Sequence, residues 1–211
     1  MEILGNEQHK IIYGDAIEAL KTIPNNSVDL IFADPPYNIG KNFNGLIEKW
    51  DSEDNYLKWC YEWLDLCILK LKDNGSFYVM TATQFMPFFD IYLRNKLNIL
   101  SRLVWYYDSS GVQAKKYYGS MYEPILFCVK DKNNYTFNAN DILVEAKTGA
   151  KRKLIDYRKK YQLSITLKRY QVMCGNFQEL DIVWMNTKTI QHKSLSLYLS
   201  VLLKQVLMKE I

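Results

Sequence analysis

Glycine is scarce in this 211-residue chain, and after Gly149 the only glycine is Gly175. A loop that cradles a phosphate or a nucleotide at the start of a helix needs several glycines within a few residues. The last part of the chain therefore contains no loop of this kind.

Cysteine and histidine are also sparse. The cysteines form no CxxC pair and have no metal-ligand spacing with His9 or His192. We therefore expect reduced thiols and no metal site. The four cysteines are Cys60, Cys67, Cys128 and Cys174.

Long apolar runs are missing as well. No basic segment followed by an apolar one opens the chain, and no run is long enough to cross a bilayer. The apolar content of 48% is that of a folded globule, and the length suits one domain. We expect a soluble cytoplasmic protein with no membrane partner.

The most informative feature that is present is a stiff polar turn at the end of an apolar run. Residues 28–33 read as a buried parallel strand, and Asp34-Pro35-Pro36-Tyr37 follow it. Ligands of open α/β sheets bind at the carboxyl ends of strands. Asp34 and the Pro35 carbonyl could accept both hydrogens of an exocyclic amine, and Tyr37 could stack on the ring that carries it. These are the groups needed to methylate the amine of a flipped-out base.

This motif and its surroundings resemble the amino-methylating DNA methyltransferases. The matching residues run from Asn26 through Asp34-Pro35-Pro36-Tyr37 to Asn38-Ile39-Gly40. The chain is most similar to the adenine-N6 enzymes of the permuted β order, in which the catalytic motif precedes the glycine loop for S-adenosyl-L-methionine. The resemblance implies that Asp34, Pro35, Pro36 and Tyr37 are catalytic.

Alternating strand and helix patterns predict an α/β domain with a largely parallel sheet. Helices are expected after Asp15, over 56–71 and over 84–97, with Trp59, Trp63, Leu66 and Leu69 on one buried face of the second. Expected strands are 10–13, 28–33, 76–80, 99–107 and 124–130. The resemblance implies a Rossmann-like methyltransferase sheet with helices on both faces, incomplete at the C-terminus.

Asp15 is predicted to cap the first helix. The resemblance also places a Gly-Asp turn beside the adenine of the cofactor, S-adenosyl-L-methionine. Asp15, Ala16 and Asp34 are therefore the expected cofactor-binding residues, and capping and binding are compatible roles for Asp15.

Basic residues near aromatic ones predict contacts with double-stranded DNA. Lys115 and Lys116 precede two tyrosines in a linker that is similar in position to a DNA-contacting loop of the family. Lys151, Arg152 and Lys153 lie in a basic stretch over 147–160, for which a solvated helix face is an equal alternative. The segment 122–127 is similar to a strand that leads to the wall of the base pocket. Intact family members suggest a homodimer.

The resemblance stops near Arg158. The family expects His-Pro-Thr-Gln-Lys-Pro and then a glycine loop, and neither is present. A shifted reading frame accounts for the missing segment. Each codon of that frame consists of the third base of one residue's codon and the first two bases of the next. Between 188 and 195 this frame permits His-Pro-Thr-Gln-Lys-Pro. We therefore expect residues 1–158 to be the methyltransferase catalytic portion and 159–211 to be an out-of-frame tail. A divergent native tail is the alternative.

Together these features predict a DNA methyltransferase that acts on the N6 amine of adenine, impaired in the form given. Two alternatives remain open. One is N4 methylation of cytosine, against which Asp34 argues because those enzymes more often carry serine there. The other is a DNA-binding remnant or subunit without catalysis, which the missing glycine loop favours.

Overall fold

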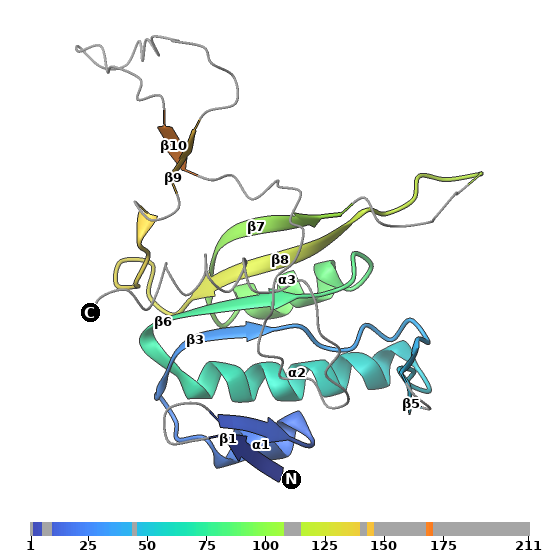
Figure 1. The fold of residues 1–211 in the computed structure, drawn as a ribbon, viewed down its shortest axis with the longest axis horizontal. Coiled ribbons are helices and arrows are strands. Elements are labelled where there is room, and N and C mark those ends of the chain that lie inside the picture. Colours follow the sequence, from blue (N-terminus) through green and yellow to red (C-terminus); the bar gives the residue numbers. More distant parts are fainter. Residues whose placement is uncertain are drawn as a thin grey trace.

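A four-stranded sheet forms the centre of the protein (Figure 1). The computed structural model describes residues 2–5, 10–43, 46–107, 115–139, 143–145 and 168–170. The strand order is β3 (Val28–Ala33), β6 (Leu71–Met80), β8 (Tyr122–Val129), β7 (Asn98–Tyr106). β3 and β6 are parallel, whereas β8 is antiparallel to both of its neighbours. The α/β prediction is confirmed, but the sheet is mixed because a hairpin joins β7 to β8.

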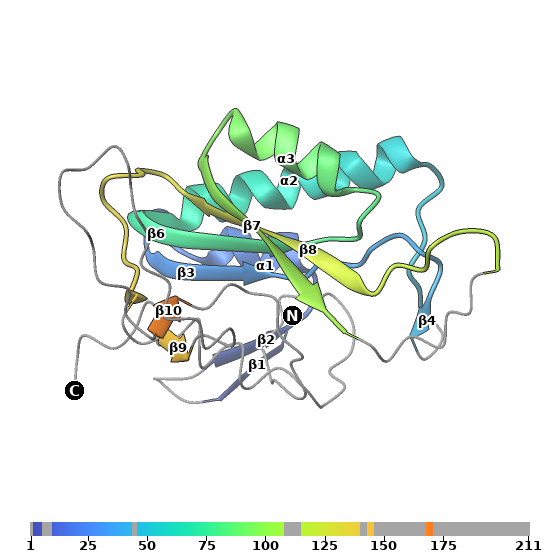
Figure 2. The same ribbon diagram turned by 90° about the horizontal axis from the view of Figure 1, so that it is seen from above.

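Three helices pack on one face of this sheet: α1 (Ala16–Thr22), α2 (Glu53–Lys70) and α3 (Met86–Arg94). Figure 2 shows α2 and α3 together on the same side of the strands. The apolar faces of the helices pack against every second side chain of the strands, because successive side chains of a strand point to opposite faces. Together they form one core. The buried strand residues in this core are Ile31, Ala33, Leu71, Phe77, Val79, Leu126 and Cys128.

The opposite face carries a second, smaller core. Its buried members are Phe32, Tyr78, Met80, Ile125, Phe127 and Val129. The Tyr78 and Phe127 rings stack with centroids 4.5 Å apart. Helices were predicted on both faces, but in the described ranges none covers this one. In the described part of 10–139, all three helices belong to the core on the other face. β7 then leads into the antiparallel strand β8 without an intervening helix.

In the described residues, three two-stranded antiparallel sheets lie outside the main sheet. They are β1 (Glu2–Gly5) with β2 (Lys10–Tyr13), β4 (Asn42–Phe43) with β5 (Leu46–Ile47), and β9 (Leu143–Glu145) with β10 (Lys168–Tyr170). The strand predicted at 10–13 therefore forms, but it pairs with β1. Of the predicted tail after 158, the described part contains β10. None of the described helices combines the length and apolar character needed to cross a membrane.

Helix α2 begins earlier than predicted, because the Ser52 side chain caps it by accepting a hydrogen bond from Asn55 N at 3.1 Å. Its buried face is also rotated from the predicted one. Trp63 is buried, but Trp59 and Leu66 are only partly buried and Leu69 is 48% exposed. Smaller cysteines share the buried face and allow close packing, which a search for large apolar residues overlooks. The buried residues are Tyr56, Leu57, Cys60, Trp63, Leu64, Cys67 and Lys70.

Strand β6 follows α2 directly, whereas the sequence predicted the helix to end at 71 and the strand to begin at 76. Gly75 instead lies inside the strand. A Cβ atom there would lie 2.8 Å from Leu71 Cδ1 and 3.0 Å from the Asp29 carbonyl oxygen. The glycine thus permits close approach to β3, where the register shifts between Val28 and Leu30. After this shift, β3 and β6 pair from Leu30 with Ser76 to Ala33 with Val79.

Candidate active site

The ends of three strands meet at one edge of the sheet. Ala33 pairs with Val79 and Met80 pairs with Ile125, so β3 and β6 end beside the beginning of β8. Thr81 N donates to the Pro124 carbonyl oxygen at 3.2 Å and ties β6 to β8 just past the strand end. Because β8 runs in the opposite direction, its first residues face the turn that follows β3.

An acidic cluster forms at this edge around the Tyr37 hydroxyl. The Tyr37 hydroxyl donates to Asp34 Oδ1 at 2.7 Å and lies 3.2 Å from Glu123 Oε2. All three side chains are partly buried. Asp34 and Tyr37 come from the predicted motif, whereas Glu123 comes from β8, far away in the sequence.

Burial and like charge keep protons on this cluster. Burial raises the pKa of Asp34 to about 8; the hydrogen bond from Tyr37 opposes this rise and the nearby Glu123 carboxylate adds to it. Burial also raises the pKa of Glu123, against the hydrogen bond from Tyr37. The pKa of Tyr37 is raised by burial and by the charge on Asp34. The cluster therefore gains a proton more readily than exposed carboxylates do.

This raised pKa predicts that the protein loses stability as the pH rises. A carboxyl whose pKa is higher in the folded state stabilises the fold below its unfolded pKa, and the effect disappears as the pH rises through the folded pKa. For Asp34 the window runs from 3.8 to about 8. Each pKa unit corresponds to about 1.4 kcal/mol of unfolding free energy.

We expect Asp34→Asn to flatten the fall in stability between pH 5 and 8.5, measured by urea unfolding. Asp90→Asn is the control, because Arg102 and Arg94 lower the pKa of Asp90. The stability that the ionised Asp90 carboxylate contributes is lost only as the pH falls through its lowered pKa, so it does not change between pH 5 and 8.5. An unchanged slope in Asp34→Asn would contradict the raised pKa.

The turn after Tyr37 is held in place by residues of its own loop. Asn38 adopts a left-handed conformation with φ 55°, which asparagine tolerates better than most residues. Its Oδ1 accepts from Trp50 N at 2.9 Å, and its N–H donates to Glu48 Oε1 at 3.1 Å. From α2, the Tyr56 hydroxyl donates to the Pro36 carbonyl oxygen at 2.8 Å. The backbone on both sides of Tyr37 is thus held by hydrogen bonds.

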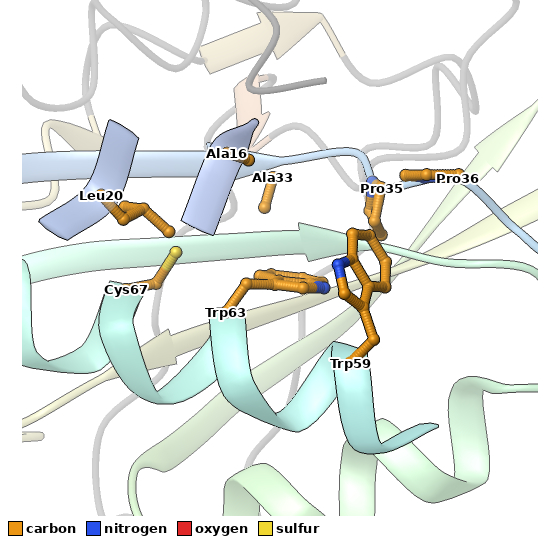
Figure 3. Close-up of a pocket in the computed structure, with 8 residues that line it drawn as sticks. All are labelled: Ala16, Leu20, Ala33, Pro35, Pro36, Trp59, Trp63 and Cys67. Carbon is orange, nitrogen blue, oxygen red and sulfur yellow. The ribbon is translucent and has the colours of Figure 1, made fainter. Parts of the chain in front are cut away.

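A small apolar hollow lies beside the two prolines (Figure 3). Ala16 and Leu20 line it from α1, Ala33 from β3, and Trp59, Trp63 and Cys67 from α2, with Pro35 and Pro36 completing the wall. Ala16 and Pro35 line the same hollow, and the cofactor-binding role of Ala16 stays a prediction. Asp15 Oδ1 accepts from Glu18 N at 3.0 Å, which confirms the predicted helix cap.

The predicted DNA-binding residues are only partly described. Lys115 and Lys116 are exposed, and the following Tyr117 and Tyr118 are 72% and 102% exposed. They precede β8, and the described segment 115–121 extends beyond the end of the sheet (Figure 1). Lys151, Arg152 and Lys153 lie outside the described residues.

Sequence reasoning did not assign roles to three residues that complete the site: Glu48, Tyr56 and Glu123. Their partners lie 10 to 86 positions away along the chain, so local patterns could not pair them. Glu123 did lie in a segment singled out as a pocket wall. That segment was the one available signal.

Comparison with known proteins defines the class. The family profile described as DNA methylase, for N6 and N4 enzymes, matches residues 28–198. The chain is 63% identical over 155 residues to the DNA adenine methyltransferase YhdJ of Escherichia coli, covering 74% of this chain and 52% of that protein. It is 33% identical over 140 residues to the type II methyltransferase M.HpaI of Haemophilus parainfluenzae, covering 65% of this chain and 44% of that protein.

A solved structure adds evidence on the fold alone. The PvuII DNA methyltransferase (cytosine-N4-specific) has a TM-score of 0.50 and 16% identity, covering 63% of this chain and 52% of that one. The fold is therefore that of a methyltransferase α/β domain. More particularly, the chain belongs to the N6/N4 DNA methylase family. It spans about half of the length of the relatives it matches, or less.

Proposed function

We propose that this chain carries the base-binding half of a DNA methyltransferase that modifies the N6 amine of adenine. The observation that carries the proposal is the Asp34-Pro35-Pro36-Tyr37 turn at the carboxyl end of β3, fixed by hydrogen bonds from both sides. The high identity to a protein named as a DNA adenine methyltransferase supports adenine as the base. The test is labelled methyl transfer to DNA with identification of the product base.

In the proposed mechanism, the flipped adenine places its amine between Asp34 and the Pro35 carbonyl oxygen. Both oxygens accept amine hydrogens and leave the nitrogen lone pair directed away from the ring plane. Tyr37 stacks on the base, and positioning supplies most of the rate increase. When bound, S-adenosyl-L-methionine supplies a methyl group on a positively charged sulfur. After transfer, the nitrogen loses one proton, which the ionised form of Asp34 can accept through the same contact.

The residues present fit one part of that cofactor. The walls of the hollow beside Ala16 and Pro35 are apolar, which matches the chemistry of an aromatic ring face. Asp15 uses Oδ1 for its helix cap, and a carboxylate has further lone pairs for a ligand donor. Asp15, Ala16 and Asp34 would therefore hold the cofactor's adenine side, while a glycine loop elsewhere would be needed for the remainder.

Double-stranded DNA is the proposed partner. Lys115 and Lys116 would contact phosphates, with Tyr117 and Tyr118 beside them for stacking. Lys151, Arg152 and Lys153 are proposed to extend this surface. A homodimer and a cytoplasmic location complete the proposal.

The non-catalytic alternative is favoured by one observation. The chain contains no glycine loop after Gly149, and such a loop supplies backbone N–H groups to the cofactor. A remnant would bind DNA but not the cofactor. The N4-cytosine alternative rests on the shared fold with a cytosine-N4-specific enzyme, which does not determine the base.

We propose that a frameshift near Lys159-Lys160 causes the missing loop. The hidden His-Pro-Thr-Gln-Lys-Pro segment supports this proposal, although the family profile continues to residue 198. Sequencing the gene should reveal a slip of one or two bases near these codons, with a glycine-rich loop further along the other frame. Stop codons in that frame before the loop would rule the proposal out.

A further inference from the structure

We propose that Glu123 is a positioning residue of the base site. Its carboxylate is a second acceptor for the Tyr37 hydroxyl, so Tyr37 stays in place when Asp34 turns to the amine of a base. The inference rests on the proposed function and adds a residue that the sequence motif does not contain.

The geometry allows one hydrogen to serve two acceptors in turn. A phenol has a single O–H, which donates well to one oxygen at a time. The Asp34 oxygen lies 2.7 Å from the Tyr37 oxygen and the Glu123 oxygen lies 3.2 Å from it. Asp34 is therefore the main acceptor without a base. When an amine occupies Asp34, rotation of the hydroxyl hydrogen alone brings Glu123 into use.

The rest of the turn favours a fixed ring with a movable hydrogen. The loop bonds of Asn38 to Trp50 and Glu48 hold the backbone next to Tyr37. Tyr37 also packs against both apolar cores. Without Glu123, the movement of Asp34 to the amine would leave the partly buried Tyr37 hydroxyl without an acceptor, at a cost to base binding.

A purely structural role does not explain a second carboxylate at this position. Two acidic groups on one hydroxyl repel each other, and partial burial increases the penalty. This arrangement weakens the fold when both are ionised, so stability alone does not favour it. Among the described residues the structure gives Glu123 no hydrogen-bond donor except Tyr37, so its carboxylate is free to serve as the second acceptor of that hydroxyl.

Other charged and titratable groups surround the cluster. Lys41, before β4, attracts both carboxylates, and Glu48, after β5, repels Asp34. Tyr56 of α2 and Tyr107 after β7 also interact electrostatically with the cluster, through Asp34 and Glu123 respectively. Any pH effect assigned to Glu123 must therefore be separated from theirs.

The test is a ¹³C NMR titration of the carboxyl groups in the full 211-residue chain. In Glu123→Gln a negative charge is lost, and we expect the pKa of Asp34 to fall by roughly one unit. In Tyr37→Phe the hydroxyl that both carboxylates share is lost. We expect the pKa values of Asp34 and Glu123 both to rise, that of Asp34 more because it is the main acceptor without a base. Glu48→Gln, the matched control, should lower the Asp34 pKa less because Glu48 does not bond to Tyr37.

The opposite directions in the two variants identify the shared hydroxyl. A Glu123 pKa that stays unchanged in Tyr37→Phe would overturn the proposal, as would an Asp34 pKa that stays unchanged in Glu123→Gln. If Glu123→Gln does not fold, Tyr37→Phe still decides, because both carboxyls must respond. The titration needs neither DNA nor cofactor, so its failure is distinguishable from failure of the proposed methyl transfer.

Discussion

Asp34→Ala should abolish methyl transfer while leaving DNA affinity nearly unchanged. The expected loss of rate is roughly a thousandfold or more, because the amine loses its main acceptor at the reacting atom. Phosphate contacts dominate DNA affinity, and Asp34 is predicted to touch only the flipped base. The measurement is labelled methyl transfer by a protein with the proposed reading frame restored, together with DNA binding by fluorescence anisotropy.

Two companion variants make this result specific. Asp34→Asn keeps an oxygen acceptor and should lose less activity than Asp34→Ala. The double variant Lys115→Ala/Lys116→Ala should show the reverse pattern, with weaker DNA binding and a salt dependence reduced by about two units of log–log slope. Substantial activity in Asp34→Ala would remove that residue from the mechanism.

The second large effect concerns the cofactor. We expect the chain as given to bind S-adenosyl-L-methionine at least about a hundredfold more weakly than the frame-restored protein, a difference of about 2.7 kcal/mol. The missing glycine loop supplies backbone N–H groups at a helix N-terminus, and α1 and the apolar hollow do not replace them. Equilibrium dialysis with labelled cofactor measures both proteins.

Asp15 offers a matched pair of variants in the restored protein. Asp15→Ser keeps a capping oxygen and removes the carboxylate, whereas Asp15→Ala removes both. If Asp15 binds the cofactor, both variants should weaken binding and only Asp15→Ala should lower helix stability, by about 1 kcal/mol. Stoichiometric, tight binding by the chain as given would show that residues after 158 complete the site.

The sequence predicted those parts of the fold that depend on local patterns. The strand before Asp34, the cap at Asp15 and the main helices are set by short-range periodicity and capping chemistry. The pairing of β2 with β1 and the use of one sheet face by all three described helices depend on contacts between distant segments. Local patterns carry no information on these contacts.

The same division applies to the site. Asp34 and Tyr37 are adjacent to the prolines that stiffen their turn, so the motif could be recognised directly. Glu123 reaches the Tyr37 hydroxyl only because β8 runs antiparallel to β6, a fact of topology. The sequence assigned Tyr37 only a stacking role for its ring. In the structure its hydroxyl also lies within hydrogen-bonding distance of the carboxylates of Asp34 and Glu123.

The measurement that tests the central claim most directly is identification of the base that the frame-restored protein methylates. Duplex DNA is incubated with tritiated S-adenosyl-L-methionine, digested to nucleosides and separated by chromatography. The account predicts label in N6-methyladenine, and its loss in Asp34→Ala. Label in N4-methylcytosine, or no transfer to DNA by a folded protein that binds the cofactor, would contradict it.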